Sequence, residues 1–138
     1  MIEDDEGHAR LIEKNIRRAG VGNEIIPFVN GTDALNYLLG DDRSGAASAK
    51  RQQLILLDLN LPDMTGIDIL QKLKGNKHTK RSPIVVLTTT DDSREIQRCY
   101  DLGANVYIRS VCCGHAGPRN SLIRCPVCQF STLTTILA

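Results

Sequence analysis

The 138-residue chain has no tryptophan, and aromatic residues make up only 4% of it, so its core is expected to be aliphatic. It has no apolar run near the roughly 20 residues that cross a bilayer. The acidic N-terminus from Glu3 to Glu6 is unlike a secretory signal. Lysine and arginine total 17 against 16 aspartates and glutamates, which leaves no excess charge to attract nucleic acid or a membrane surface. We therefore expect a cytoplasmic protein without nucleic-acid or membrane partners.

Acidic residues are absent after Ser110, and this change in composition divides the chain. We expect residues 1–109 to form one domain, followed at residues 110–138 by an atypical tail outside its fold. The Cys-x-x-Cys spacing at residues 125–128 is that of half a zinc site, which Cys113 or His115 could complete. The first pair lacks matching spacing, so we favour an accidental pattern. The tail contains four of the five cysteines, namely Cys112, Cys113, Cys125 and Cys128.

Hydrophobic periodicity predicts helices that alternate with strands. Helical spacing covers residues 8–19, 30–39, 67–73 and 92–102, and strand-like runs cover residues 24–29, 54–57, 84–87 and 105–108. This alternation predicts an α/β fold, a doubly wound parallel sheet with helices on both faces. Pro27 places its strand at a sheet edge. An opening strand is represented only by Met1 and Ile2, which is expected to leave a gap in the sheet, and no closing helix follows the last strand.

Acidic side chains fall where the predicted strands end. Glu3 and Asp4 follow the short opening strand, Asp58 ends a central strand, and Thr88 ends the next strand. Ligands of open parallel sheets bind at this edge. Crowded carboxylates favour a hard cation such as Mg²⁺, and a carboxylate held against such an ion can attack a phosphoryl group. Each feature alone is more typical of a solvated helix start or an N-cap. Their order at strand ends favours a site.

Three segments resemble the receiver domains of two-component response regulators. They are Ile-Glu-Asp-Asp at residues 2–5, Leu-Leu-Asp-Leu-Asn-Leu-Pro-Asp-Met-Thr-Gly at residues 56–66, and Pro-Ile-Val-Val-Leu-Thr-Thr at residues 83–89. The chain is similar to the single-domain, phytochrome-associated branch over residues 2–109. The resemblance implies a flavodoxin-like fold of strand order 2-1-3-4-5. In this chain the first strand is expected to be truncated and the last helix absent or replaced.

The resemblance also implies a role for each matching residue. Asp58 corresponds to the phosphoacceptor, Thr88 to the hydroxyl that contacts the phosphoryl group, and Tyr107 to the aromatic residue that moves with it. The implied cofactor is Mg²⁺. Asp4 would bind it directly, Glu3 would help through water, and Asn60 would supply a backbone carbonyl. The implied metal ligands are therefore Glu3, Asp4, Asp58 and Asn60.

The chain departs from the family after its last strand. Ser110 and Val111 stand where receivers have a Lys-Pro pair. A buried charge-assisted contact contributes about 1.5–3 kcal/mol, so the change to serine should weaken the coupling of phosphorylation to conformation. We hypothesise that this reading frame starts at an internal Met and leaves the true frame near Ser110.

The function implied is phosphorelay signal transduction, and the chain is not expected to be an enzyme in its own right. Its partners would be a sensor histidine kinase and a downstream protein, and the chain could also form a homodimer. One alternative is a degenerate receiver or truncated gene product without phosphotransfer. A phosphatase with Asp58 as nucleophile is disfavoured, because haloacid-dehalogenase-type enzymes have a second Asp where this chain has Asn60.

Overall fold

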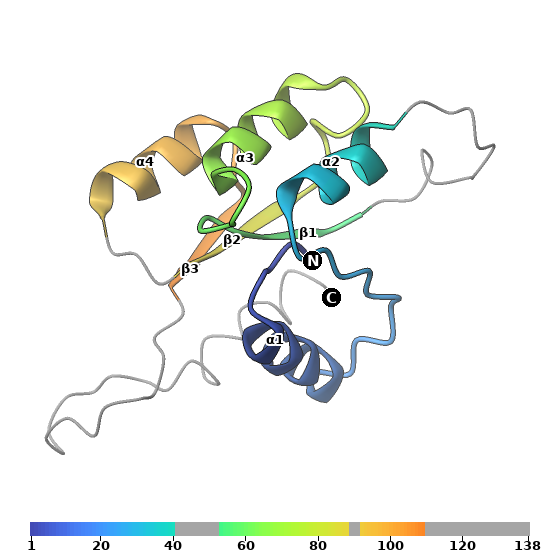
Figure 1. The fold of residues 1–138 in the computed structure, drawn as a ribbon. Coiled ribbons are helices and arrows are strands. Elements are labelled where there is room, and N and C mark those ends of the chain that lie inside the picture. The colour runs from blue at the N-terminus through green and yellow to red at the C-terminus, as the bar shows by residue number, and fades with distance from the viewer. Residues whose placement is uncertain (41–52, 89–91, 110–138) are drawn as a thin grey trace, which may run out of the picture.

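Figure 1 shows the computed structural model of the chain, which describes residues 1–40, 53–88 and 92–109. The described helices are α1 (Glu6–Arg18), α2 (Gly31–Leu39), α3 (Gly66–Gly75) and α4 (Ser93–Asp101). The strands are β1 (Ile55–Asp58), β2 (Ile84–Thr88) and β3 (Val106–Arg109). These elements confirm the predicted helices and the last three predicted strands to within two residues at each end. The expectations for the tail, including its cysteines and the closing helix, lie outside the described residues.

The three strands form one parallel sheet in the order β1-β2-β3. Asp58 at the end of β1 lies opposite Leu87 of β2, and Thr88 lies opposite Arg109 of β3. The carboxyl ends of the strands therefore meet at one edge. This is the edge at which the sequence predicts a site.

Residues 1–3 take the place of the opening strand. Ile2 forms parallel bridges to Phe28 on one side and to Leu57 on the other. Its N–H donates to the Leu56 carbonyl at 2.8 Å, and its carbonyl accepts the Asp58 N–H at 3.0 Å. The spatial order is thus Phe28, Ile2, β1, β2, β3, which is the predicted order 2-1-3-4-5. The expected gap is filled at the edge that carries the acidic residues.

The strand predicted at residues 24–29 is largely wrong. The structure has only an isolated bridge at Phe28, and residues 24–27 are irregular. The backbone of residues 24–29 pairs with the sheet only near Phe28, because the neighbouring segment, residues 1–3, is short. Phe28 N–H donates to the Met1 carbonyl at 2.8 Å, and the Phe28 carbonyl accepts the Glu3 N–H at 2.9 Å.

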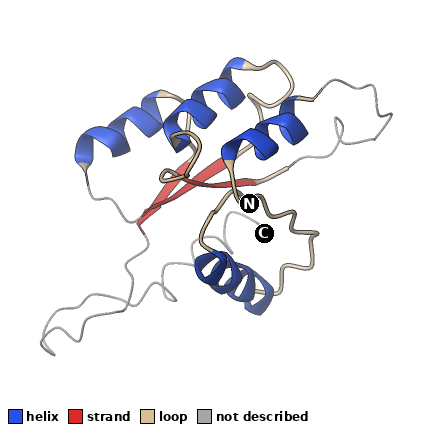
Figure 2. Cartoon of the chain, in the orientation of Figure 1, coloured by secondary structure: helices blue, strands red, loops and turns tan. Residues whose placement is uncertain are grey.

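Helices cover both faces of the sheet, with α2, α3 and α4 on one side and α1 on the other (Figures 1 and 2). Because side chains alternate along a strand, Leu57 and Leu56 face opposite layers. Both layers are apolar, which explains the uninterrupted hydrophobic run of β1. The larger layer includes Ala34, Leu35, Leu57, Ile69, Leu70, Leu73, Val86 and Cys99. The layer under α1 contains Ile12, Ile16, Leu56, Val85, Leu87 and Ile108. Among the described residues, no helix is both long and apolar enough to cross a membrane.

Side-chain caps fix where the helices next to the site begin. Asp5 accepts the His8 N–H at 2.7 Å and so starts α1 directly after the acid pair. Thr65 accepts the Asp68 N–H at 3.2 Å and starts α3 after the loop that follows Asp58. Each cap satisfies an N–H that has no partner within its helix. The strand-to-helix turns on both sides of the site are therefore set locally.

Candidate metal and phosphoacceptor site

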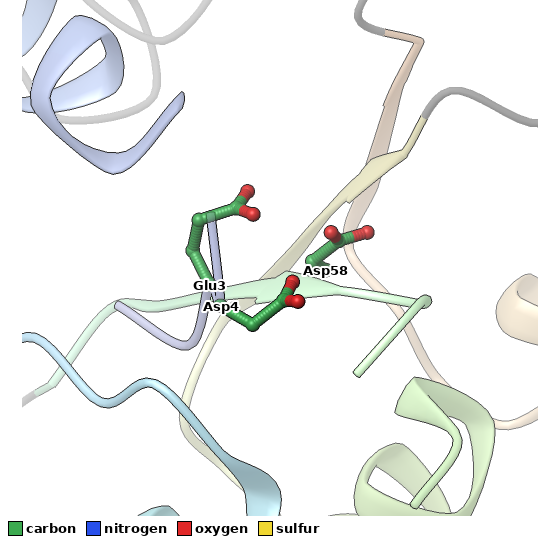
Figure 3. Close-up of side chains that lie close together, drawn as sticks. All are labelled: Glu3, Asp4 and Asp58. Atoms are coloured by element: carbon green, nitrogen blue, oxygen red, sulfur yellow. The ribbon is translucent and has the colours of Figure 1, made fainter. Parts of the chain in front are cut away.

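Three carboxylates from two separate segments meet at the sheet edge. One oxygen from each of Glu3, Asp4 and Asp58 lies within 4.8 Å of the others. Figure 3 shows the three carboxyl groups arranged around one space. The backbone pairing of Ile2 with β1 fixes this arrangement, because it aligns the end of the opening segment with the end of β1. The structure thus brings together the three acidic residues that the sequence singled out.

The three carboxylates differ in their exposure to water. Glu3 is buried, Asp58 is half-buried and Asp4 is exposed. Burial raises the pKa of Glu3, with a further increase from the charge of Asp58 and an opposing effect from His8. Burial is also the largest cause of a raised pKa at Asp58, and the charge of Asp4 adds to it. The backbone N–H groups of Asn60 and Leu59 act in the opposite direction, because they stabilise the Asp58 carboxylate.

The residues present fit a hard divalent cation. Oxygen ligands from carboxylates are what Mg²⁺ prefers. Glu3 Oε2 is buried, and within the described residues it makes no hydrogen bond and has His8 Nδ1 as a charged-group neighbour at 2.6 Å, which leaves this carboxylate oxygen incompletely compensated. A cation between the carboxylates would compensate that oxygen and relieve the repulsion that raises both pKa values. The exposed Asp4 leaves the site open to solvent on one side.

Asn60 lies beside the carboxylate of Asp58. Its N–H donates to Asp58 Oδ1 at 3.2 Å. An antiparallel bridge between Asn60 and Thr65 closes the loop, and the Gly66 N–H donates to the Leu59 carbonyl at 2.9 Å. The loop is therefore folded back on itself next to Asp58. The use of the Asn60 carbonyl as a metal ligand stays a prediction.

Thr88 and Tyr107 lie on the neighbouring strands. Thr88 is the last residue of β2, is only 1% exposed, and follows the residue opposite Asp58. By alternation it shares a face with Val86, which is paired with Tyr107. Tyr107 is half-buried and packs against the layer of α2, α3 and α4. Neither residue belongs to the acidic cluster, and their proposed switch roles stay predictions. Ser110 lies outside the described residues.

Two residues near the site were not identified from the sequence. His8, in the first turn of α1, places Nδ1 2.6 Å from Glu3 Oε2. Asp63, in the loop after Asp58, accepts the N–H groups of Gly31 at 2.9 Å and Thr32 at 2.7 Å. The Thr32 hydroxyl also donates to Asp63, and these bonds lower the pKa of Asp63 to about 2. The contacts of Asp63 join segments that only the fold brings together, and the contact of His8 depends on where α1 begins, so residue spacing alone did not indicate either.

Residues 1–110 match the family model of the response regulator receiver domain. The chain belongs to this family. Its expected relation to single-domain, phytochrome-associated regulators is confirmed by its similarity to the cyanobacterial phytochrome response regulator RcpA, which is 29% identical with a TM-score of 0.74, covering 99% of this chain and 86% of that chain. Response regulator Rcp1 from Synechocystis sp. is 32% identical over 108 residues, covering 78% of this chain and 72% of Rcp1.

Solved receiver structures agree with the fold. The receiver domain from Rhodospirillum rubrum is 65% identical and has a TM-score of 0.81, covering 99% of this chain and 90% of that chain. The crystal structure of Mn²⁺-bound Rcp1 is 32% identical with a TM-score of 0.70, covering 80% of this chain and 78% of that chain. The flavodoxin-like receiver fold is therefore confirmed, and this receiver domain belongs to two-component signalling.

Proposed function

We propose that this receiver accepts a phosphoryl group on Asp58 from a sensor histidine kinase in the cytoplasm. The observation that carries the proposal is the meeting of Glu3, Asp4 and Asp58 within 4.8 Å at the end of β1. In the reaction, the P–N bond of a phosphohistidine breaks and an Asp58 oxygen forms a bond to phosphorus. The electron pair of the broken bond returns to the histidine ring.

The proposed cation is Mg²⁺, held by Asp4, Asp58, the Asn60 carbonyl and, through water, Glu3. When bound, it would offset negative charge on the transferring oxygens. Asp58 supplies the nucleophile, and its half-buried position leaves it accessible to a phosphodonor. The Asn60 N–H bond to Oδ1 orients the carboxylate. Preorganisation of this kind favours a reaction that depends mainly on positioning and electrostatics.

Phosphorylation would then be sensed on the neighbouring strands. Thr88, at the end of β2, would donate its hydroxyl to the phosphoryl group. Tyr107, on the same face of the sheet, would move with it and change the surface offered to a downstream protein or to a second receiver. We take residues 1–109 as the receiver unit and residues 110–138 as a tail outside the family fold. Ser110, in the position of the family lysine, should make this coupling weaker than in receivers that keep the lysine.

The test uses the full chain, MgCl₂ and acetyl phosphate as a small phosphodonor, with intact-protein mass spectrometry as the readout. We expect a mass increase of one phosphoryl group, which Asp58→Asn abolishes and which EDTA prevents. Asp101→Asn is a matched control, because Asp101 is an exposed aspartate at the end of α4, outside the acidic cluster and the loop after Asp58. A folded wild-type protein without an adduct would contradict the proposal and favour a degenerate receiver that binds partners without phosphotransfer.

The same samples address the enzymatic alternative. We expect the adduct to persist long enough to be weighed and to decay without catalytic turnover of phosphate esters. Asn60, in place of a second acid, leaves the site without the general acid that a phosphatase of this kind needs. Sustained release of phosphate from p-nitrophenyl phosphate, lost in Asp58→Asn, would instead support a phosphatase.

A further inference from the structure

His8 lies next to the acidic cluster but is not part of the proposed metal-ligand set. Its Nδ1 is 2.6 Å from Glu3 Oε2, and its side chain is 21% exposed, against 2% for the side chain of Glu3. A lone pair on Nδ1 would repel the carboxylate at this distance, so Nδ1 carries the proton. The Nδ1–H bond does not point along the line to Oε2 as in a hydrogen bond, so this is a close electrostatic contact.

The other oxygen of Glu3 has a weak partner. The Asp5 N–H donates to Glu3 Oε1 at 3.2 Å. Within the described part of the chain, this carboxylate has polar contacts with Asp5 and His8. A buried carboxylate needs such partners, because water no longer solvates it. Removal of the contact to His8 would leave the weak bond from Asp5 as the remaining one of these two contacts.

The backbone of α1 holds His8 in place. Its own N–H donates to the Asp5 side chain at 2.7 Å, which is the N-cap bond that starts the helix. His8 and Asp5 therefore act from the same turn on opposite oxygens of Glu3. The first turn of α1 thus forms a clamp around one carboxylate of the cluster.

We propose that His8 is a positioning residue of the cation site, which keeps the Glu3 carboxylate directed toward the space shared with Asp4 and Asp58. The inference rests on the proposed function, because it assigns His8 a role toward the cation that Glu3 helps to hold. It predicts that Mg²⁺ affinity depends on a donor group at position 8. Outer partners that orient ligand groups typically contribute about 10- to 100-fold in metal affinity. Because Glu3 is expected to bind the cation through water, we expect an effect near 10-fold, the lower end of that range.

The experiment compares two substitutions of similar shape. Asparagine can place its side-chain N–H near the position of Nδ1, whereas leucine fills the same volume without a donor. The dissociation constant for MgCl₂ is measured by titration calorimetry on the full chain with wild type, His8→Asn and His8→Leu. His78→Leu, at an exposed histidine away from the cluster, is the matched control. Circular dichroism confirms that each variant is folded.

We expect His8→Leu to raise the Mg²⁺ dissociation constant about 10-fold, with His8→Asn close to wild type and His78→Leu unchanged. Equal affinity in His8→Leu and wild type would overturn the proposal. So would tighter binding in His8→Leu, which would mean that His8 competes with the cation for Glu3. Failure of His8→Asn to restore affinity would also overturn it.

Asp4→Asn separates this inference from the proposed function. We expect it to abolish Mg²⁺ binding while the protein stays folded. If the wild type shows no binding that Asp4→Asn removes, the cation site itself is refuted, and the role of His8 with it. If Asp4→Asn abolishes binding and His8→Leu leaves it unchanged, only the role of His8 is refuted.

Discussion

Gly66 is the position at which a single methyl group should disturb both the fold and Asp58, the proposed phosphoacceptor. It is the first residue of α3 and is buried. A Cβ at this position would lie 2.4 Å from the Asp58 carbonyl oxygen and 2.6 Å from the Leu59 Cα. Ordinary contacts between such atoms are about 3.5 Å or more. Because both neighbours are backbone atoms, Gly66→Ala must move the loop that follows Asp58, or α3 itself, by roughly 1 Å.

The size of this effect follows from the clash. Overpacking in a closely packed region costs about 1–3 kcal/mol, so we expect the free energy of unfolding to fall by about 2 kcal/mol. For a domain of this size, that lowers the melting temperature by about 10 °C. A displacement of about 1 Å at a reacting group can reduce a rate on the order of 100-fold. We therefore expect phosphorylation of Asp58 to slow by about that factor.

Two other glycines of the same chain are matched controls. A Cβ on Gly75, at the end of α3, would meet nothing within 4 Å. Gly75→Ala should therefore raise stability by about 0.5 kcal/mol, because alanine restricts the unfolded chain. A Cβ on Gly31 would meet side-chain atoms of Ile69 and Met64 at 2.6 Å. Side chains can rotate away, so Gly31→Ala should fall between the other two.

Thermal unfolding by circular dichroism and the rate of adduct formation with acetyl phosphate are measured for all three variants. From most to least stable, we expect the order Gly75→Ala, wild type, Gly31→Ala, Gly66→Ala. The predicted effect of the clash is refuted if Gly66→Ala melts within about 2 °C of wild type. It is also refuted if Gly66→Ala is destabilised but is phosphorylated at the wild-type rate, since the clash would then have been absorbed away from Asp58.

Three further predictions follow from the described contacts. The lowered pKa of Asp63, about 2 against an ordinary 3.8, means that its contribution to stability is present above pH 4 and lost as the pH falls toward 2; urea unfolding should show Asp63→Asn less stable than wild type at pH 7, with the difference vanishing near pH 2. The raised pKa of Asp58 means that folding disfavours its ionised form increasingly as the pH rises through that pKa. At pH 7 in EDTA, Asp58→Asn should therefore melt a few degrees higher than wild type, and MgCl₂ should reduce this difference. A melting temperature of Asp58→Asn below that of wild type in EDTA would contradict the prediction. Leu70 is fully buried between α3 and the sheet, so Leu70→Ala should cost about 3 kcal/mol in urea unfolding, and a loss below about 1 kcal/mol would mean that the core had collapsed around the cavity.

The elements that could be predicted from the sequence are those whose signals are local. β1 and β2 are short apolar runs bounded by polar residues, and the structure buries them on both faces. The apolar stripe of Ile67, Leu70 and Leu73 predicted which face of α3 packs against the core, and these residues are buried. The clustering of Asp58 with the acid pair was also predictable, because parallel strands bring their carboxyl ends to one edge.

The features that were missed depend on pairing between distant segments. Ile2 replaces the opening strand through two bridges, and a stretch of three residues is too short to show a period. The segment at residues 24–29 has the composition of a strand, but its pairing is restricted to the neighbourhood of Phe28. Its composition favours a β-strand, but the short partner segment at residues 1–3 limits how many of its residues can pair. The contacts of Asp63 with Gly31 and Thr32 were missed for the same reason, whereas the contact of His8 with Glu3 is local and depends on where α1 begins.

The acidic run at residues 3–6 admits both of the interpretations weighed from the sequence, and the structure divides it between them. Asp5 caps α1 and Glu6 lies in the first helical turn, where the helix dipole stabilises negative charge by about 0.3–1 kcal/mol. Glu3 and Asp4 instead remain at the sheet edge and face Asp58. The cap is what separates the two pairs, because it fixes the residue at which the chain leaves the sheet and enters the helix. A helix start and the proposed cation site are therefore compatible here, because the N-cap at Asp5 begins α1 directly after the two acidic residues that stay at the sheet edge.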